Sequence, residues 1–433
     1  MNLRIITLLL ILVSAGCTRD EFGSRDSGGS FGVPVGDSQA SNGDDDTAVP
    51  NDVDNEAGGT NNLSSPDPFP TTDEGVEGVS PAALSAMEAI TRATFTDASA
   101  SSGNFVFSPL ALASTLSVAG LAGDAAMRDA VEGRLAQSDL ESVALGLSDV
   151  ISATHGGEDE PVILSTMWVD PSTSINTAFL GAVVPELVQD VRTVDFSSLD
   201  QARQTINNYY RTQSEGLLPS VVGPLGLKTG ERSALVNGVY FHGAWDVPFS
   251  VDDTAEGVFR GDGGDVTTAF MEREGSFLVR RAADYDAIVV PYRSTYSLVL
   301  IKAADVAART RIEGQFSAQL LTEIINESQV EEVRLKMPRV EVEGRLESNL
   351  FGGAVADNAE REGAFSNAGI EASGALIQRA VVSFDESGTS AIFPNDSVGA
   401  VFSGEFALDQ PYLFAIRESS TGFVLLAGRV NRL

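Results

Sequence analysis

Cysteine and histidine are nearly absent from this 433-residue chain. Cys17 is the single cysteine, so no disulfide can form within the chain. His155 and His242 are the only two histidines, the side chain that most often transfers protons or binds metal ions near neutral pH. No HExxH, CxxC, Walker or GxGxxG pattern occurs either. The sequence therefore predicts a protein that has no metal site and no cofactor and is not an enzyme. The alternative is an enzyme with a catalytic triad built on His242.

Basic side chains are also scarce. Lysine and arginine number 28 against 61 aspartates and glutamates, and the formal net charge is −33. Residues 79–433 alone carry 47 acidic and 25 basic side chains. Such a surface repels phosphate backbones and anionic headgroups, so neither nucleic acid nor a bare lipid surface is an expected partner. The run Asp44–Asp46 lacks the glycine and terminal glutamate of an EF-hand, and is interpreted as solvated acidic side chains.

The apolar run near the amino end, Ile5–Val13, is too short to span a bilayer as a helix. It follows Arg4 and precedes small residues, so residues 1–16 are predicted to be a secretory signal peptide. Cys17 follows "SAG" and resembles the cysteine of a bacterial lipobox, which is lipidated and becomes the mature amino terminus. Ser14 departs from that pattern, in which a large aliphatic residue is usual. We expect Cys17 to be lipidated; ordinary signal cleavage with a free thiol is the alternative.

Residues 17–78 are rich in Gly, Ser, Asp, Asn, Thr and Pro, and residues 18–78 carry 14 acidic and 2 basic side chains. This composition cannot bury enough apolar surface to fold, so it predicts a disordered acidic tether with a span of about 40 Å. Thr18, in place of an aspartate, favours the outer membrane in a two-membrane cell. We therefore expect an exported protein, lipid-anchored to the cell envelope at the outer membrane or cell surface, or otherwise secreted.

Residues 79–433 are predicted to form one folded domain. The stretch "SPAALSAMEAITRATF" predicts a helix from Pro81, because Ser80 can cap it and apolar side chains recur at helical spacing. β-branched and aromatic runs such as "PVILSTMWVD" and "SALVNGVYFHGAW" predict strands. The helices and strands alternate without a βαβ rhythm, which indicates an α+β fold. Tyr412–Arg417 and Phe423–Val430 should form a buried hairpin.

A long polar stretch, "DESGTSAIFPNDSVGAVFSGEF", separates apolar strands near the carboxyl end. A structureless loop of this length in a compact domain needs a functional reason. Four other segments, spread over the domain, resemble the serpin (serine protease inhibitor) family. They are "NFVFSPLALASTL", "INNYYRTQSEGLL", "VNGVYFHGAWDVPF" and "FALDQPYLFAIRESSTGFVLLAGRV". With the lipobox-like start, the resemblance is to a bacterial serpin.

The resemblance implies an α+β serpin fold with three β-sheets, eight or nine helices and an exposed carboxyl-terminal reactive-centre loop at 386–405. It implies an inhibitor that needs no catalytic residues. A serine or cysteine endopeptidase cleaves the loop as a suicide substrate, and the cut loop inserts into the main sheet as a new strand before the acyl-enzyme hydrolyses. The expected protein is a monomer without a cofactor.

The same resemblance assigns the reactive-loop hinge to Glu386, Gly388, Thr389 and Ala391. Glycine permits a sharp turn, and small residues can enter a sheet first. Insertion would place alternate residues on one packed face of the sheet.

The family's usual loop length puts the scissile bond between Phe402 and Ser403, with Ala400 or Val401 as alternatives because this loop is about two residues shorter than in many relatives. A phenylalanine there favours a protease with an apolar pocket, chymotrypsin-like or subtilisin-like. Because the protein is expected to be exported, the expected target is extracellular or periplasmic.

The hinge departs from the family at Ile392, Phe393 and Pro394, where inhibitory relatives carry small residues. Phe393 would overpack the sheet, and Pro394 would interrupt a central strand because it lacks an N–H. The alternative is therefore a non-inhibitory serpin, which acts as a binding or scaffold module or as a protease substrate.

A second set of residues is implied to hold the strands that part during insertion. Ser108 and Asn237 match the family's buried cluster, whereas Gln378 stands at the usual histidine position and Ala111 at a usual serine. Glutamine can bridge by hydrogen bonds but does not titrate. Trp245 matches the tryptophan that the family places near the top of the sheet, and a core aromatic is also expected there.

Overall fold

The computed structural model describes residues 79–99, 102–154, 161–182, 187–241, 243–347, 351–388 and 404–433. The predicted signal peptide, Cys17 and the predicted tether lie outside the described residues. So do His155, His242 and residues 389–403.

Helices cover much of the first half of the folded region. The described helices are α1 (Pro81–Ser99), α2 (Pro109–Ala122), α3 (Ala125–Leu135), α4 (Leu140–Thr154), α5 (Thr177–Ala182), α6 (Leu199–Gln213), α7 (Val306–Gln315), α8 (Ala318–Asn326) and α9 (Gly353–Ala359), with short 3-10 turns η1 (Val251–Asp253) and η3 (Ser366–Ala368). α1 begins at Pro81, as predicted. α2 begins where Ser108 accepts the Ala111 N–H and Pro109 occupies the first turn.

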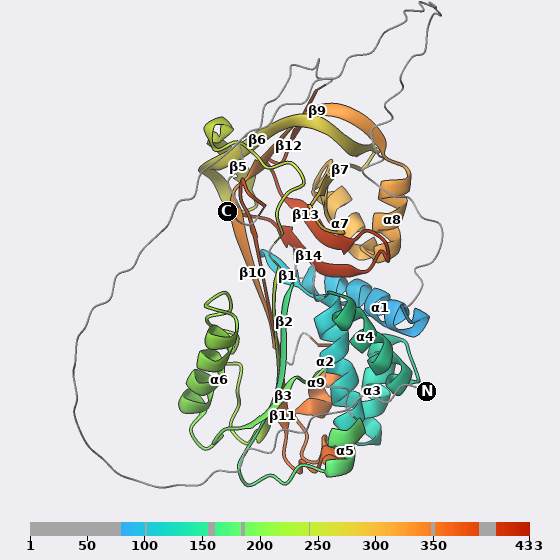
Figure 1. Ribbon diagram of the computed structural model, residues 1–433, viewed down its shortest axis with the longest axis vertical. Helices are drawn as coiled ribbons and strands as arrows, with labels where there is room; N and C mark the ends of the chain where they lie inside the picture. Colours follow the sequence, from blue (N-terminus) through green and yellow to red (C-terminus); the bar gives the residue numbers. More distant parts are fainter. Residues whose placement is uncertain are drawn as a thin grey trace, which may run out of the picture. The chain divides into compact units, whose positions relative to one another are not determined.

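A five-stranded sheet fills one half of the domain. Its strand order is β10 (Val340–Glu347), β11 (Gly374–Phe384), β4 (Ser233–Phe241), β2 (Val162–Val169) and β3 (Asp190–Thr193). The pairs β10–β11 and β2–β4 are antiparallel, whereas β11–β4 and β2–β3 are parallel. α6 lies on one side of this sheet, and α2, α3 and α9 lie on the other (Figure 1).

The remaining described strands form a second hydrogen-bonded network. Its order is β1 (Phe105–Phe107), β14 (Val424–Val430), β13 (Tyr412–Glu418), β8 (Tyr296–Ala303), β7 (Tyr285–Pro291), β6 (Gly264–Arg281), β9 (Gln329–Pro338) and β12 (Gly404–Ala407), and β5 (Ala255–Gly261) also pairs with β6. β6 joins two parts, because its first residues pair with β5, its middle and later residues pair with β9, and its last four residues pair with β7. The predicted hairpin is confirmed as β13–β14.

The fold prediction is thereby confirmed as α+β, with nine α-helices in the described ranges. The three sheets of the prediction correspond to the five-stranded sheet and to the two parts of the second network, which share β6 as one continuous strand. β6 spans 18 residues, so a single strand can serve both parts.

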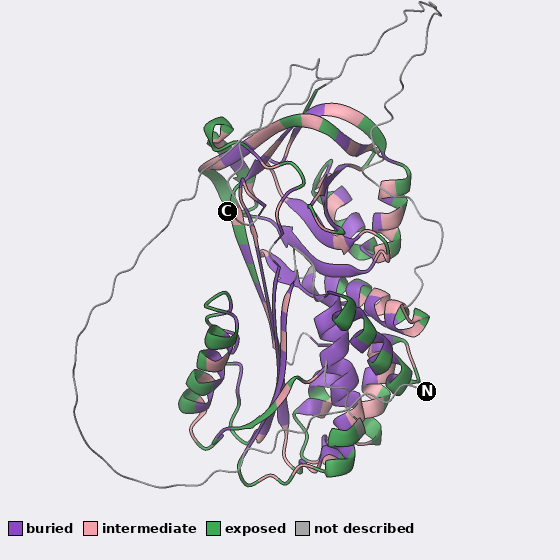
Figure 2. Cartoon of the chain, viewed as in Figure 1, coloured by how far each residue is buried: buried purple, intermediate pink, exposed green. Residues whose placement is uncertain are grey.

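Two apolar cores flank the five-stranded sheet. The larger contains α2, in which every residue except Leu121 is buried, and the hairpin β13–β14 (Figure 2). The smaller lies beneath α6 and includes Tyr210, Leu218, Val236 and Ile377.

Within the described residues, no helix is long and apolar enough to cross a membrane. No group of three or more His, Cys, Asp or Glu side chains in the same ranges is arranged to hold a metal ion.

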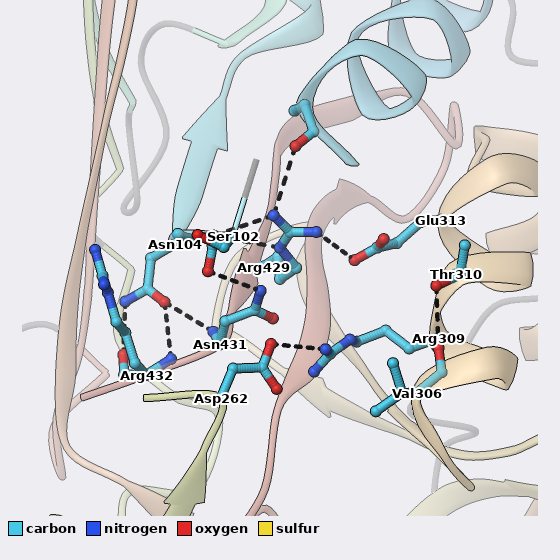
Figure 3. Close-up of polar contacts among 12 residues, drawn as sticks. Ser102, Asn104, Asp262, Val306, Arg309, Thr310, Glu313, Arg429, Asn431 and Arg432 are labelled. Atoms are coloured by element: carbon cyan, nitrogen blue, oxygen red, sulfur yellow. Dashed lines mark hydrogen bonds and ion pairs between the residues drawn. The ribbon is translucent and has the colours of Figure 1, made fainter. Parts of the chain in front are cut away.

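The carboxyl-terminal strand is fixed by a buried ion pair. Arg429 in β14 donates to a Glu313 carboxylate oxygen of α7 at 2.7 Å, and both side chains are at least 96% buried. Figure 3 shows Arg429 beside Glu313. The same guanidinium donates to the backbone oxygen of Gly103 at 3.1 Å and lies over the Phe105 ring. Asn104 then holds the next residues, because its side-chain oxygen accepts the N–H of Asn431 at 2.7 Å.

Candidate functional site

The candidate site starts at the boundary between β4 and β11. These two strands pair directly along nine registered positions, from Ser233 opposite Gly374 to Phe241 opposite Val382. No other described strand lies between them. Any segment that enters here must break this ladder and move the two strands apart by one strand spacing, about 4.8 Å. Because β4 and β11 run parallel, a segment that turns back after β11 would run antiparallel to both neighbours.

Residues 385–388 reverse the chain after β11. Asp385 organises the turn: its carboxylate accepts the Ser387 N–H at 2.9 Å and its backbone oxygen accepts the Gly388 N–H at 3.3 Å. Gly388 has φ +93°, and a Cβ there would lie 2.3 Å from the Gly243 backbone oxygen. Only glycine fits both the backbone conformation and the space. The sharp turn expected at Gly388 is therefore present, and its role as a hinge stays a prediction.

Trp245 holds this turn from the other side. Its ring is fully buried and stacks on Tyr292 with 4.5 Å between ring centroids. The indole N–H donates to the Asp385 backbone oxygen at 2.9 Å, and the Trp245 backbone N–H donates to the Ser387 oxygen at 3.2 Å. Trp245 is both the core aromatic that we expected and a direct partner of the turn.

Glu386 anchors the turn through its side chain. The carboxylate is buried and forms an ion pair with Arg339, which lies between β9 and β10; the Arg339 Nε is 3.1 Å from Oε2. Thr254 donates its hydroxyl to the other oxygen at 2.6 Å. Burial alone would raise the pKa of Glu386, but the hydrogen bonds from Arg339 and Thr254 outweigh it and the pKa lies below its usual value. The Glu386 backbone oxygen also accepts the Phe249 N–H at 2.8 Å.

Of the other three predicted cluster residues, Asn237 and Gln378 lie halfway along the ladder, and Ser108 lies at the start of α2. Gln378 and Asn237 are directly opposite each other in β11 and β4. Gln378 is fully buried and makes two hydrogen bonds of 3.0 Å with the backbone N–H and oxygen of Ser108. It thus bridges β11 to the start of α2, as expected of a glutamine at this position. Trp245 is in a different place, at the turn beyond the end of β4.

Asn237 has a partner that the sequence did not indicate. Its side-chain N–H donates to the Ser165 hydroxyl at 2.5 Å, and Ser165 is the residue directly opposite in β2. The buried polar contacts at this level therefore occur in two separate pairs, Ser108 with Gln378 and Ser165 with Asn237. The two adjacent hydroxyl residues within the mostly apolar run "VILSTMWV", Ser165 and Thr166, are the signal that could have located it.

The remaining predicted site residues lie outside the described residues. They are Thr389, Ala391, Ala400, Val401, Phe402 and Ser403, together with Ile392, Phe393 and Pro394. The fifteen residues 389–403 connect the turn at Gly388 to β12 at Gly404, and β12 belongs to the other sheet network. β12 pairs in parallel with β9 from Gly404 to Ala407.

Comparison with known proteins agrees with this geometry. The family profile "Serpin (serine protease inhibitor)" matches residues 86–433. Leukocyte elastase inhibitor A from Mus musculus is 26% identical over 368 residues, which cover 77% of this chain and 94% of that protein. An uncharacterized serpin-like protein from Thermococcus kodakarensis is 25% identical over 396 residues, which cover 86% of this chain and 92% of the relative.

Two solved structures share the fold. Native protease nexin-1, solved with heparin, matches with a TM-score of 0.71 at 20% sequence identity and covers 82% of this chain and 100% of its own. Uncleaved ovalbumin matches with a TM-score of 0.71 at 20% identity and covers 81% of this chain and 100% of its own. The family profile spans nearly all of the described fold, from within α1 to the last residue. The chain belongs to the serpin family.

Proposed function

We propose that this serpin inhibits an extracellular or periplasmic serine or cysteine endopeptidase by acting as a one-use suicide substrate. Serpins are generally protease inhibitors rather than enzymes. The observation that supports the trapping mechanism here is the uninterrupted parallel β4–β11 ladder, followed at once by the pinned turn at 385–388. A segment that turned back after β11 would run antiparallel to both β4 and β11, as an inserted strand must.

In the proposed reaction, the protease nucleophile attacks the carbonyl carbon of the residue before the scissile bond. The peptide bond to the next residue breaks, and the new amino group takes the proton and leaves. We place this bond between Phe402 and Ser403, with Ala400 or Val401 as alternatives, and a chymotrypsin-like or subtilisin-like protease as the target. Insertion of the freed loop before water attacks the acyl-enzyme would retain the protease.

A disulfide across the ladder tests this mechanism. Val239 and Ala380 are opposite each other in adjacent strands, at a spacing of about 4.8 Å that suits a disulfide, and both are fully buried. A Val239→Cys/Ala380→Cys variant in a Cys17→Ser background has no other cysteine. When oxidised, it should be cleaved by chymotrypsin or subtilisin without forming an SDS-stable complex; after reduction, it should form the complex. The two single cysteine variants are the controls and should trap under both conditions.

The alternative is a non-inhibitory serpin that serves as a binding or scaffold module, or only as a substrate. Ile392, Phe393 and Pro394 favour it, because a large ring and a missing N–H both oppose strand insertion. If the unmodified chain is cleaved without a stable complex or a gain in thermal stability, this alternative holds. The variant Ile392→Ala/Phe393→Ala/Pro394→Ala should then gain trapping.

We further propose that the protein is exported, bacterial and lipid-anchored at Cys17, and acts as a monomer on the cell envelope. The lipobox-like "SAGC" and the acidic stretch that follows support this. Radiolabelled palmitate should enter the wild-type protein and not a Cys17→Ser variant, and the variant should be released in soluble form. Equal release of both forms would instead indicate ordinary signal cleavage.

A further inference from the structure

β12 carries the chain from the end of the loop onto the outer face of a sheet. It pairs in parallel with β9 over the four positions that begin at Gly404, and β9 pairs in turn with β6. These three strands lie together at one end of the folded region (Figure 1). Phe406 is fully buried and Glu405 is exposed. Because successive side chains of a strand point to opposite faces, Glu405 lies on the outer face of this sheet.

The residues next to Glu405 hold it in place. On the opposite face, the Phe406 ring centroid lies 5.3 Å from the guanidinium carbon of Arg281 and 5.3 Å from the Nζ of Lys302. Lys302 also donates to the backbone oxygen of Ala407 at 3.0 Å. These contacts fix β12 on the sheet, so the Glu405 carboxylate has a defined position just beyond the loop.

Arg334 of β9 lies directly opposite Glu405, where it could neutralise the carboxylate. Its guanidinium is instead bound to Glu274, the residue opposite it on the other side, in β6; the Nε lies 2.9 Å from Oε1. Lys336 is arranged in the same way, with its Nζ 2.6 Å from a Glu272 carboxylate oxygen. Both basic side chains of β9 on this face therefore turn toward β6, and Glu405 keeps its negative charge.

The surrounding sequence supplies no other positive charge. From residue 380 to residue 416 the chain has no lysine, arginine or histidine, but it has five acidic residues. This stretch includes the whole loop and β12. A partner that binds the loop therefore meets a negative surface on the carboxyl-terminal side of the cleaved bond.

Glu405 lies within reach of a protease that cleaves the loop. It is the third residue after a bond between Phe402 and Ser403, about 10 Å along an extended chain, and the fifth residue, about 16 Å away, if the bond follows Ala400. A protease–inhibitor interface buries about 800 Å² on each partner, which is a patch roughly 32 Å across if it is circular. Such a patch, centred on any of the candidate bonds, reaches Glu405.

We propose that Glu405 is a specificity-determining residue. It favours a target protease with lysine or arginine on the side of its active-site cleft that receives the residues after the cleaved bond. Glu274 is the matching positioning residue, because it keeps Arg334 from neutralising Glu405. Opposite charges about 7 Å apart in water change a rate about two- to threefold, and the effect declines with added salt. The inference rests on the proposed function only for cleavage of the loop, since it does not require the protease to be trapped.

The test measures kcat/KM for loop cleavage of the full chain carrying Cys17→Ser. The probes are subtilisin and a version of the same enzyme in which surface residues beside that part of its cleft are replaced by lysine. The parent chain should favour the lysine-bearing form by at least about threefold at low ionic strength, and the preference should decline at about 0.5 M NaCl. Glu405→Gln should lower the preference about two- to threefold. Asp357→Asn, an equal loss of charge at an exposed position of α9, should leave it unchanged. An unchanged preference in Glu405→Gln, or an equal drop in Asp357→Asn, would overturn the proposal.

Two further variants separate Glu405 from a general change in surface charge. Glu274→Gln frees Arg334 to bind Glu405 and should lower the preference as much as Glu405→Gln does, although residue 274 lies two strands away from β12. Glu272→Gln is the matched control, because β12 has an alanine opposite Lys336 and so offers no carboxylate to neutralise. Equal effects of Glu272→Gln and Glu274→Gln would contradict the positioning role of Glu274. The rates are measured whether or not an SDS-stable complex forms, so a failure of trapping and a failure of this inference are distinguishable.

Discussion

Glu386 and Arg339 form an ion pair whose two ends lie in different surroundings: the Glu386 side chain is 6% exposed and that of Arg339 is 48% exposed. The buried Glu386 carboxylate thus holds the partly exposed Arg339 guanidinium beside the turn at the end of β11. The pair therefore links that turn to the junction of β9 and β10, two strands that belong to different sheet networks.

Glu386→Gln should lower the free energy of unfolding by about 1–2 kcal/mol, because the buried oxygens lose a charged partner while the Thr254 bond remains. Urea denaturation measures the change. Glu341→Gln, at an exposed position of β10, should stay within about 0.5 kcal/mol of the parent. An equal loss in both variants would contradict a specific role for Glu386.

Gly388→Ala should lower the free energy of unfolding by about 1–3 kcal/mol. The new Cβ would lie 2.3 Å from the Gly243 backbone oxygen, and the φ of +93° is strained for alanine. Gly404→Ala is the matched control at the other end of the same loop, where a Cβ meets nothing within 4 Å. Thermal denaturation should separate the two. Similar stabilities would show that the turn relaxes at no cost.

Arg429→Met should lower the free energy of unfolding by about 3–5 kcal/mol, because it leaves the buried Glu313 carboxylate without its cationic partner. Glu313→Gln should cost less, since the amide oxygen can still accept from Arg429. The exposed pair of Arg92 with Glu88 offers a comparison, and Arg92→Ala should change stability by less than about 0.5 kcal/mol. If Arg429→Met is no worse than Arg92→Ala, the buried pair is dispensable.

Stability should depend on pH through Glu231, which lies just before β4. Burial raises its pKa from 4.5 to about 7, with Glu360 and Glu347 adding to the rise, while the N–H and charge of Lys228 oppose it. The folded chain therefore binds more protons than the unfolded chain between pH 4.5 and 7, and stability falls as pH rises through this window. Glu231→Gln should remove about 2–3 kcal/mol of the stability difference between pH 5 and pH 8.

Urea denaturation at both pH values, with the exposed Glu371→Gln as the control, checks the Glu231 prediction. Carboxylates whose pKa lies below the usual value, such as Asp124 and Asp170, act in the opposite direction: they make the free energy of unfolding rise with pH, at lower pH values. Only the difference between wild type and Glu231→Gln isolates the one residue. Parallel pH profiles for these two forms would refute the assignment.

Local sequence patterns were sufficient for the elements that depend on nearest neighbours. The start of α1 at Pro81 and the β13–β14 hairpin follow from capping, periodicity and turn residues. The turn at Gly388 was located through the family resemblance, although the backbone freedom that it needs is a property of glycine itself. The α+β class followed from the order of such elements, and the family resemblance supplied the sheet arrangement.

Contacts between distant segments could not be predicted in the same way. Arg339 lies 47 residues before Glu386, and Thr254 lies 132 residues before it, so no spacing rule relates them. Ser165 joins Asn237 only because β2 and β4 pair in one particular register. The continuity of β6 through both parts of the second network was likewise not indicated by the sequence, because it depends on pairing with strands far apart in the chain.

The parallel junction between β4 and β11 has a further consequence for the energy of the sheet. A strand added there would replace one parallel junction with two antiparallel ones, and antiparallel pairing is slightly more stable for each residue. If the proposed insertion takes place, part of the free energy that drives it would come from this change of backbone pairing. That contribution would be retained after the replacement of almost any single side chain along the ladder.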